Sequence, residues 1–299
     1  MRIPVAAPYD WTFLAGFLGA RAIPGVEAVT PGRYARTVRL AGRPGRLTVE
    51  PDDAGACTCL AVALEHPDPD ALLLARPRIE ALFDTRADPA VIGAHLSRDP
   101  GLAPHVARRP GLRVPGAWDG FEMAVRAILG QQVSVGAATI LAGRLVACFG
   151  EPLEDPGGTG LVRLFPGPEA LAEADLAPVL RMPGARAAAI RGLAVAVLSD
   201  PDLLRPGTPL EEAVARLRGL RGIGEWTARY VALRALKEPD AWPAGDVGLM
   251  RALGAGRGRA GAAMLAARSA PWSPWRAYAA LHLWTQDSLE VGIVEQAAG

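Results

Sequence analysis

The hydrophobic and polar positions divide the chain into two parts with different periods. In residues 1–85, short runs that alternate in polarity or are rich in β-branched residues are separated by Gly, Pro and Asp turns, which is typical of antiparallel strands. Apolar residues at helical spacing alternate with these runs and indicate helices. Strands are expected at Tyr34–Leu40, Gly45–Glu50 and Cys57–Leu64, and helices at Thr12–Ala22 and Pro69–Phe83. This part therefore predicts an α+β domain with an antiparallel sheet.

From Pro89 onward, strand signals are scarce and the apolar positions follow a helical period. Helices are expected over 89–98, 119–129, 133–149, 168–181, 185–199, 209–218, 225–236, 247–253, 259–270 and 274–288. Stretches rich in Pro and Gly at 99–116 and 152–167 are typical of connectors. The change of pattern predicts an N-terminal α+β domain at 1–88 and a helical region at 89–299.

The stretch Ala213–Leu253 contains a glycine-spaced turn between two helical segments. Gly222 and Gly224 permit positive φ angles and a close approach to another backbone. The helix that begins near Glu225 presents unpaired N–H groups, and its dipole favours a phosphate by roughly 0.3–1 kcal/mol. An ordinary αα-hairpin with glycines for close packing explains the same pattern, so the turn alone leaves both interpretations open.

A single carboxylate, Asp246, follows the turn Pro243–Gly245 and heads the next helical run. As an N-cap it would stabilise that helix by about 1 kcal/mol. A turn that fixes its position also suits a carboxylate held at a reactive site. The two roles are compatible, and the pattern does not separate them.

Aromatic residues make up only 6% of the chain but gather in its last quarter. Trp226 and Tyr230 are four residues apart and share a helix face, and Trp284 belongs to the final helix. Such rings either fill a core or line a pocket that stacks a flat, electron-poor ligand, where a cationic ring over Trp gains about 0.5–2 kcal/mol. Two polar residues, Gln131 and Gln132, lie between two apolar helices. They belong either to a solvated turn or to a loop whose polar side chains enter a groove.

Composition and charge exclude several classes. The net charge of +1 does not by itself indicate a nucleic-acid binder. No apolar run approaches the ~18 residues of a membrane span, and the N-terminal stretch lacks the run of a signal peptide. Three cysteines and four scattered histidines form no disulfide framework and no metal-ligand set, so a reduced, cytoplasmic protein is expected. Lys237 is the only lysine, which leaves one side-chain amine for any mechanism that needs one.

Four separated motifs, in the right order, give the chain a resemblance to a known family. Leu220–Ala228 resembles the helix–hairpin–helix of the DNA glycosylase superfamily, and Trp242–Leu249 resembles the loop and aspartate that follow it. Phe121–Ser134 and Pro274–Trp284 are similar to one branch, the AlkA-type 3-methyladenine DNA glycosylases II. The similarity extends to residues 8–11 and 16–18 and so covers nearly the whole chain.

The resemblance implies a fold and a set of site residues. The helical region would form two subdomains, one at about 117–237 with the hairpin at 217–228, the other from about 89–116 plus 238–299. Asp246 matches the catalytic aspartate, and the base pocket would be lined by Trp226, Tyr230, Trp284, Phe17 and Val247. DNA would be contacted by Gln131, Gln132, Gly222, Gly224, Glu225 and Thr227, with Gln132 filling the gap left by a flipped base. The backbone carbonyls of Arg218, Leu220 and Ile223 match a structural Na⁺ or K⁺ site.

The implied function is a monofunctional base-excision repair glycosylase. It would flip 3-methyladenine and related alkylated bases from double-stranded DNA and hydrolyse the N-glycosidic bond, as a monomer without a required cofactor or a membrane partner. Relatives with lyase activity carry a lysine where Trp226 stands, which disfavours a bifunctional glycosylase/lyase. Val247 stands where some members have an aromatic residue, which predicts an open pocket wall. A non-catalytic hairpin module that binds distorted DNA remains the alternative, although such a module has no need of Asp246.

Overall fold

The N-terminal part of the chain forms an antiparallel sheet. The computed structural model describes residues 1–52, 58–155, 157–256 and 258–285. The sheet has five strands in the order β1-β5-β4-β3-β2. The strands are β1 (Arg2–Pro4), β2 (Glu27–Thr30), β3 (Arg33–Leu40), β4 (Arg43–Pro51) and β5 (Cys59–Glu65). The last four strands follow one another as a meander, and β1 adds to the free edge of β5.

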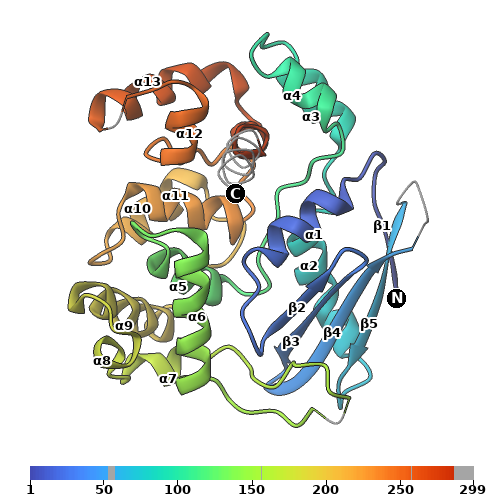
Figure 1. The fold of residues 1–299 in the computed structure, drawn as a ribbon, viewed down its shortest axis with the longest axis vertical. Coiled ribbons are helices and arrows are strands. Elements are labelled where there is room, and N and C mark those ends of the chain that lie inside the picture. The colour runs from blue at the N-terminus through green and yellow to red at the C-terminus, as the bar shows by residue number, and fades with distance from the viewer. Residues whose placement is uncertain (53–57, 156, 257, 286–299) are drawn as a thin grey trace, which may run out of the picture.

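Two helices, α1 (Trp11–Gly19) and α2 (Ala71–Phe83), pack on this sheet (Figure 1). Asp10 caps α1, because its side chain accepts a hydrogen bond from the N–H of Phe13 at 2.9 Å. Helix α1 has two apolar faces. Leu14 and Leu18 belong to the core of the sheet domain, whereas Phe13 and Phe17 pack against the helical core. Helix α1 therefore lies between the two halves of the molecule (Figure 1).

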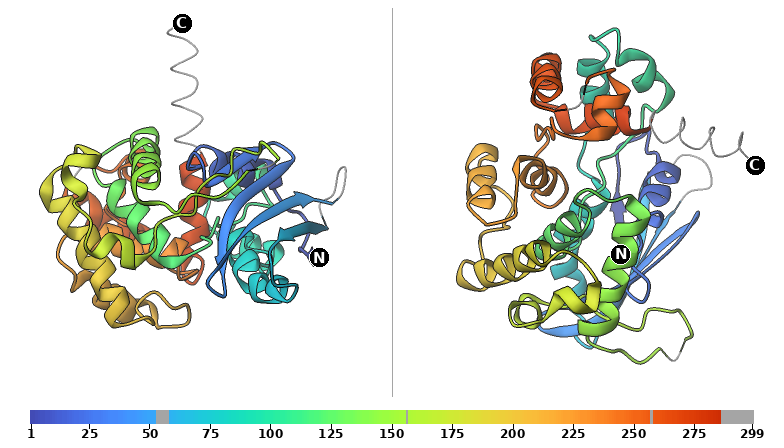
Figure 2. Two further views of the ribbon diagram at one scale, coloured as in Figure 1. Left: turned by 90° about the horizontal axis from the view of Figure 1, so that it is seen from below. Right: turned by 60° about the vertical axis from the view of Figure 1, so that its left-hand side comes forward.

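The rest of the described chain is helical. Its elements are α3 (Pro89–Leu96), α4 (Ala103–Arg108), α5 (Gly120–Leu129), α6 (Val135–Phe149), α7 (Pro168–Ala172), α8 (Leu176–Leu180), α9 (Gly184–Ser199), α10 (Leu210–Arg218), α11 (Glu225–Arg234), α12 (Val247–Ala252), α13 (Arg259–Ser269) and the 3-10 turn η1 (Ala270–Trp272). Residues 276–285 are helical up to the end of the described chain. Helices α3, α4 and α13 gather at one end (Figures 1 and 2), where Asp99 accepts hydrogen bonds from Arg268 and Trp272, each at 2.7 Å.

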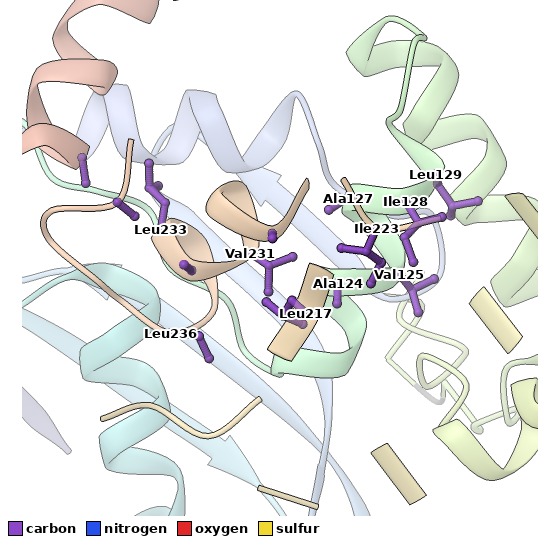
Figure 3. Packing of buried hydrophobic residues seen from close by; sticks show 14 of the residues in the cluster. Ala124, Val125, Ala127, Ile128, Leu129, Leu217, Ile223, Val231, Leu233 and Leu236 are labelled. Carbon is purple, nitrogen blue, oxygen red and sulfur yellow. The ribbon is translucent and has the colours of Figure 1, made fainter. Parts of the chain in front are cut away.

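Helix α5 is the centre of the helical core. It packs against α9 and α11, and eight of its ten residues are buried. Ile223, from the turn between α10 and α11, lies beside Val125 and Ile128 of α5 (Figure 3). The hairpin predicted from the glycines is thus attached to a helix that is almost wholly buried.

Two buried ionic clusters connect the sheet domain to the helices. In the first, Arg36 of β3 donates to Glu122 of α5 at 2.6 Å, and Arg126 of α5 donates to Glu27 of β2 at 2.8 Å. In the second, the Lys237 ammonium lies 2.9 Å from the carboxylate of Asp84, which follows α2. Because single buried charges are strongly unfavourable, each cluster requires both halves of the molecule in place.

The α+β fold class predicted from the sequence is confirmed, with local differences. The strands β1 and β2 escaped prediction because three or four residues are too few to show an alternating pattern. The connector at 99–116 contains α4, and the single helix expected over 168–181 is two short helices, α7 and α8. Cys57 and residues 286–288, at the ends of a predicted strand and helix, lie outside the described residues. Among the described helices, none is long and apolar enough to cross a bilayer.

Candidate active site

Asp246 is both a helix cap and the carboxylate of a cavity. The turn Pro243–Gly245 closes with a hydrogen bond from the N–H of Asp246 to the carbonyl of Pro243 at 2.9 Å. Asp246 Oδ1 then accepts from the N–H of Leu249 at 3.0 Å and so starts α12. The cap bond therefore fixes the carboxylate, and the same carboxylate lines the cavity.

Two indole groups hold the same carboxylate. Trp226 Nε1 donates to Oδ2 of Asp246 and Trp284 Nε1 donates to Oδ1, each at 2.9 Å. The two tryptophans are 58 positions apart and come from α11 and the final helix. Because each oxygen receives one indole N–H, the plane of the carboxylate is set by the aromatic residues around it.

The aromatic rings form one wall of the cavity. Trp226 stacks on Tyr230 with centroids 5.2 Å apart and planes 9° apart, as the spacing of four residues predicts. Tyr230 meets Trp284 edge to face, with centroids 6.2 Å apart. Phe17, on the outward face of α1, also lines the cavity. By contrast, the core interpretation holds for Trp242 and Trp272, which are buried against each other away from Asp246.

The cavity has a volume of about 320 Å³ and lies between α1, α5, α6, α11 and the start of α12. This size is within the usual range of small-molecule pockets. The prediction that Val247 lines the pocket is wrong in this structure. Its side chain is 47% exposed and points outside the lining, where Gly248 takes its place. Val247 is the first residue of α12, directly after the cap residue Asp246, and it is absent from the residues that line the cavity.

Three arginines that the sequence analysis missed also line the cavity: Arg21, Arg126 and Arg234. Arg126 is neutralised by Glu27 and Glu122. Arg234 donates to the Tyr230 hydroxyl at 2.9 Å and to the carbonyl of Gly116 at 3.0 Å. Helical spacing could have found Arg21 and Arg234, because each follows a pocket aromatic by four residues, Phe17 and Tyr230 respectively.

The arginines change the acidity of the phenol between them. Burial by itself would raise the pKa of Tyr230, but the charges of Arg234 and Arg21 outweigh burial and lower it. Burial also lowers the pKa of Arg21, although the Tyr230 hydroxyl partly compensates. One side of the cavity is thus positive, and the Asp246 side is negative.

The hairpin between α10 and α11 lies on α9. Gly222 has a φ of +89°, and a Cβ built there would lie 2.6 Å from the Cβ of Ala189. Both the backbone angle and the close approach require glycine. Gly224 precedes α11 with an ordinary φ of −87° and open space around it. Within the described residues, the main-chain N–H groups of Gly224, Glu225 and Trp226 donate no hydrogen bond, which leaves them available to an anion.

The side chains of two predicted DNA-binding residues are already engaged inside the protein. Glu225 pairs with Arg218 at 3.0 Å and with Arg229 at 2.7 Å. A carboxylate would repel a phosphate, so Glu225 offers its main-chain N–H rather than its side chain. Thr227 is buried, and its hydroxyl accepts a hydrogen bond from Gln131 at 3.0 Å. The Thr227 side chain is therefore engaged inside the protein and is not at the surface.

The two glutamines differ in their surroundings. The side-chain amide of Gln131 donates to the carbonyl of Gly222 and to the hydroxyl of Thr227. The main-chain carbonyl of Gln131 accepts from Arg186 at 2.7 Å. The side-chain amide of Gln131 therefore connects the loop after α5 to the hairpin and is not directed into solvent. Gln132 is exposed and has a φ of +58°, an uncommon conformation for a residue with a side chain. Of the two glutamines, Gln132 is the exposed one.

The hairpin also contains the carbonyls proposed to bind a cation. Leu220 accepts a turn hydrogen bond from Ile223 at 3.1 Å. The carbonyls of Arg218 and Ile223 accept no hydrogen bond within the described residues, so oxygen ligands are available. Over the same described ranges, no group of three or more His, Cys, Asp or Glu residues could hold a metal ion.

Comparisons with known proteins agree with this geometry. Residues 1–119 match the family model described as the AlkA N-terminal domain. The chain is 38% identical over 279 residues to DNA-3-methyladenine glycosylase 2 of Escherichia coli (strain K12), an alignment that covers 93% of this chain and 94% of that protein. The chain belongs to the family of AlkA-type DNA-3-methyladenine glycosylases.

A second relative is a longer protein than this chain. The chain is 43% identical over 288 residues to a probable bifunctional transcriptional activator/DNA repair enzyme AlkA of Mycobacterium tuberculosis, which covers 95% of this chain but 56% of that protein. The chain thus spans about half the length of that relative. Among solved structures, a 3-methyladenine DNA glycosylase from Archaeoglobus fulgidus superposes with a TM-score of 0.82 over 96% of this chain and 98% of that chain. Their sequence identity of 23% shows a shared fold.

Proposed function

We propose that this AlkA-type glycosylase is a monofunctional repair enzyme that hydrolyses the N-glycosidic bond of alkylated bases, 3-methyladenine among them, in double-stranded DNA. The product is an abasic site. The observation that carries the proposal is the Asp246 carboxylate, held by the indoles of Trp226 and Trp284 inside an aromatic cavity. The names of the relatives support the same reaction.

The substrate base has to leave the duplex, because the glycosidic bond is out of reach within the stack. Trp226, Tyr230 and Trp284 offer flat surfaces on which an extruded base can stack. Gln132, exposed and in a left-handed conformation, is placed to fill the gap. The free N–H groups at the start of α11 would hold a backbone phosphate.

Asp246 acts on the sugar as the bond breaks. The sugar becomes cationic when the base departs, and a carboxylate about 4 Å away at an effective dielectric of ~20 stabilises that charge by about 4 kcal/mol. This corresponds to a rate effect of roughly a thousandfold. Asp246 also suits the task of orienting or deprotonating the attacking water, since Oδ2 accepts only one hydrogen bond, from Trp226, and keeps acceptor capacity.

The absence of a lyase step follows from the position of Lys237. Burial lowers the pKa of this amine, and the charge of Asp84 opposes that effect. Lys237 donates to the carbonyl of Val114 at 2.8 Å and pairs with Asp84, away from the cavity lining. Trp226 occupies the position after Glu225 where a lyase needs its lysine. No cofactor is needed for the proposed hydrolysis, and a Na⁺ or K⁺ bound by the hairpin carbonyls would serve only to hold a phosphate.

The enzyme is proposed to act as a cytoplasmic monomer on duplex DNA. Exposed Cys148 is a free thiol, which suits a reducing compartment. A non-catalytic module that binds distorted DNA is the second candidate. It explains the hairpin, but it gives no reason for a carboxylate fixed by two indoles.

The test is product analysis on duplex DNA that contains a single alkylated base. The proposal predicts release of free 3-methyladenine and an abasic strand that breaks only on treatment with alkali. Borohydride should trap no covalent adduct. Binding without base release would favour the non-catalytic module, and a trapped adduct would favour a glycosylase/lyase.

A further inference from the structure

Two of the residues that have a positive φ without being glycine form an ion pair. Asp84, directly after α2, has a φ of +52°, and Lys237, three residues after the end of α11, has a φ of +60°. Glycine takes this conformation without steric cost and is common at the end of a helix. The Lys237 ammonium lies 2.9 Å from Oδ1 of Asp84. Both side chains are thus present where the backbone favours glycine, and each is engaged with the other.

The carboxylate of Asp84 also binds the final helix, which spans 276–285 in the described chain. Its Oδ2 accepts a hydrogen bond from the Tyr278 hydroxyl at 2.9 Å and another from the main-chain N–H of Val114 at 3.0 Å. Burial and the charge of Asp84 raise the pKa of Tyr278, so the hydroxyl keeps the proton that it donates. Asp84 and Tyr278 are both buried. Because a buried charge that loses a partner is strongly unfavourable, this cluster has one stable arrangement.

The cluster is attached to both helices that supply an indole to the active site. Trp226 belongs to α11, which Lys237 follows, and Trp284 lies about 9 Å beyond Tyr278 along the final helix. Each indole donates to one oxygen of Asp246 at 2.9 Å. A hydrogen bond weakens steeply when its distance or angle departs from the optimum. The two bonds to the carboxylate therefore form together only at one spacing of the two helices.

We propose that Asp84 and Tyr278 are positioning residues for base release, which fix the final helix relative to α11 so that both indoles hold the Asp246 carboxylate in its reactive orientation. This inference rests on the proposed glycosylase function. The cluster is outside the cavity lining, so it acts through Trp284 and not on the base. Asp84 follows α2, which packs on the sheet (Figure 1), so the sheet domain takes part in the reaction from outside the active site.

The first test compares Tyr278→Phe with the wild-type protein. Phenylalanine keeps the ring in the core but cannot donate to Asp84. Single-turnover release of 3-methyladenine should slow by roughly three- to tenfold, because one indole hydrogen bond to a charged group is weakened. Affinity for the substrate duplex should stay within about twofold of the wild type, since the hairpin is unchanged. A variant that binds DNA more weakly but releases the base at the wild-type rate would contradict the inference.

Trp284→Phe shows whether the effect passes through the indole. In this background the final helix presents no indole N–H to Asp246, so Tyr278→Phe should slow release by less than about twofold further. The melting temperature should fall by the same amount in both backgrounds. Equal losses of rate in the two backgrounds would overturn the inference, since Tyr278 would then act through the general stability of the protein.

Thr37→Val is the matched control for the loss of a buried hydroxyl. Thr37 of β3 is buried and donates to the carbonyl of Arg163 at 2.7 Å. The substitution should lower the melting temperature but leave the rate of base release within about twofold of the wild type. If Thr37→Val slowed release as much as Tyr278→Phe, a loss of stability would explain both results, and the positioning role would be refuted.

The nuclear magnetic resonance signal of the Trp284 indole separates this inference from the proposed function. In protein with isotope-labelled tryptophans, that signal is identified by its absence from Trp284→Phe. Tyr278→Phe should shift it towards the position of a more weakly hydrogen-bonded indole, and Thr37→Val should leave it in place. If the wild-type protein released no base, the glycosylase proposal would fail, but this signal would still report the position of the final helix. A Trp284 signal that is unchanged in Tyr278→Phe contradicts the inference.

Discussion

The Asp246 carboxylate accepts three hydrogen bonds, from two indoles and one helix N–H. These three donors fix the direction of the carboxylate. The arrangement explains why tryptophans, and not phenylalanines, surround it: each ring supplies a stacking surface and one N–H. The tryptophans therefore contribute to the orientation of the catalytic group as well as to the pocket.

Trp226→Phe separates these two contributions. Phenylalanine keeps an aromatic surface next to Tyr230 but cannot donate to Asp246. The single-turnover rate of 3-methyladenine release should fall about tenfold, the effect of one lost hydrogen bond to a charged group. Trp275→Phe, which alters a tryptophan outside the cavity lining, should leave the rate within about twofold of the wild type. Equal effects of the two substitutions would show that the Trp226 N–H plays no part.

The sequence predicted the carboxylate and the aromatic residues of the cavity but not its arginines. Asp246, Trp226, Tyr230, Trp284 and Phe17 do meet in one cavity, as the resemblance implied. A contact between residues far apart in the chain cannot be read from local spacing. Arg21 and Arg234 follow Phe17 and Tyr230 by four residues, but that spacing does not show the cavity that brings the two pairs together.

The geometry of the hairpin requires glycine at one of its two glycine positions. Its two glycines look alike in the sequence, but Gly222 is packed against α9 at a positive φ and Gly224 is open. Sequence analysis predicted the hairpin and its neighbouring helices because their apolar positions recur over several turns. It missed α4 and the strands β1 and β2, which are too short to show a period.

Gly222→Ala and Gly224→Ala form a matched pair for this element. The first substitution places a Cβ 2.6 Å from Ala189 and imposes an unfavourable φ, so it should destabilise the protein by roughly 1–3 kcal/mol and weaken DNA affinity. The second should change stability by less than about 0.5 kcal/mol. Urea unfolding measures the stabilities. If the two variants unfold alike, the close packing of the hairpin on α9 is not required.

At the scale of the whole molecule, buried charges join the two halves. Glu27 accepts from Tyr34 at 2.7 Å and from Arg126 at 2.8 Å, and Arg36 lies 4.0 Å away. Glu122 shares both arginines. Burial alone would raise the pKa of Glu27, but Arg126 and Arg36 outweigh it and lower the pKa from 4.5 to about 2. Nothing in the sequence paired these residues, which are up to 99 positions apart.

This shift predicts how stability depends on pH. A carboxylate whose pKa is lowered by folding stabilises the protein above its unfolded value of 4.5, and the stabilisation is lost as the pH falls toward about 2. The contribution is on the order of 3 kcal/mol. Glu27→Gln should therefore flatten the fall in unfolding free energy between these values. Glu151→Gln, which removes an exposed carboxylate, should not. A slope in Glu27→Gln equal to that of the wild type would contradict the role of the cluster.

The central claim is that the charge of Asp246 drives base release, and Asp246→Asn tests it most directly. Asparagine caps a helix as well as aspartate does, so the melting temperature should hardly change. The single-turnover rate of 3-methyladenine release from a duplex should fall by roughly a hundred- to a thousandfold, because the uncharged amide no longer stabilises the cationic sugar. A folded Asp246→Asn protein that releases the base at close to the wild-type rate would contradict the account.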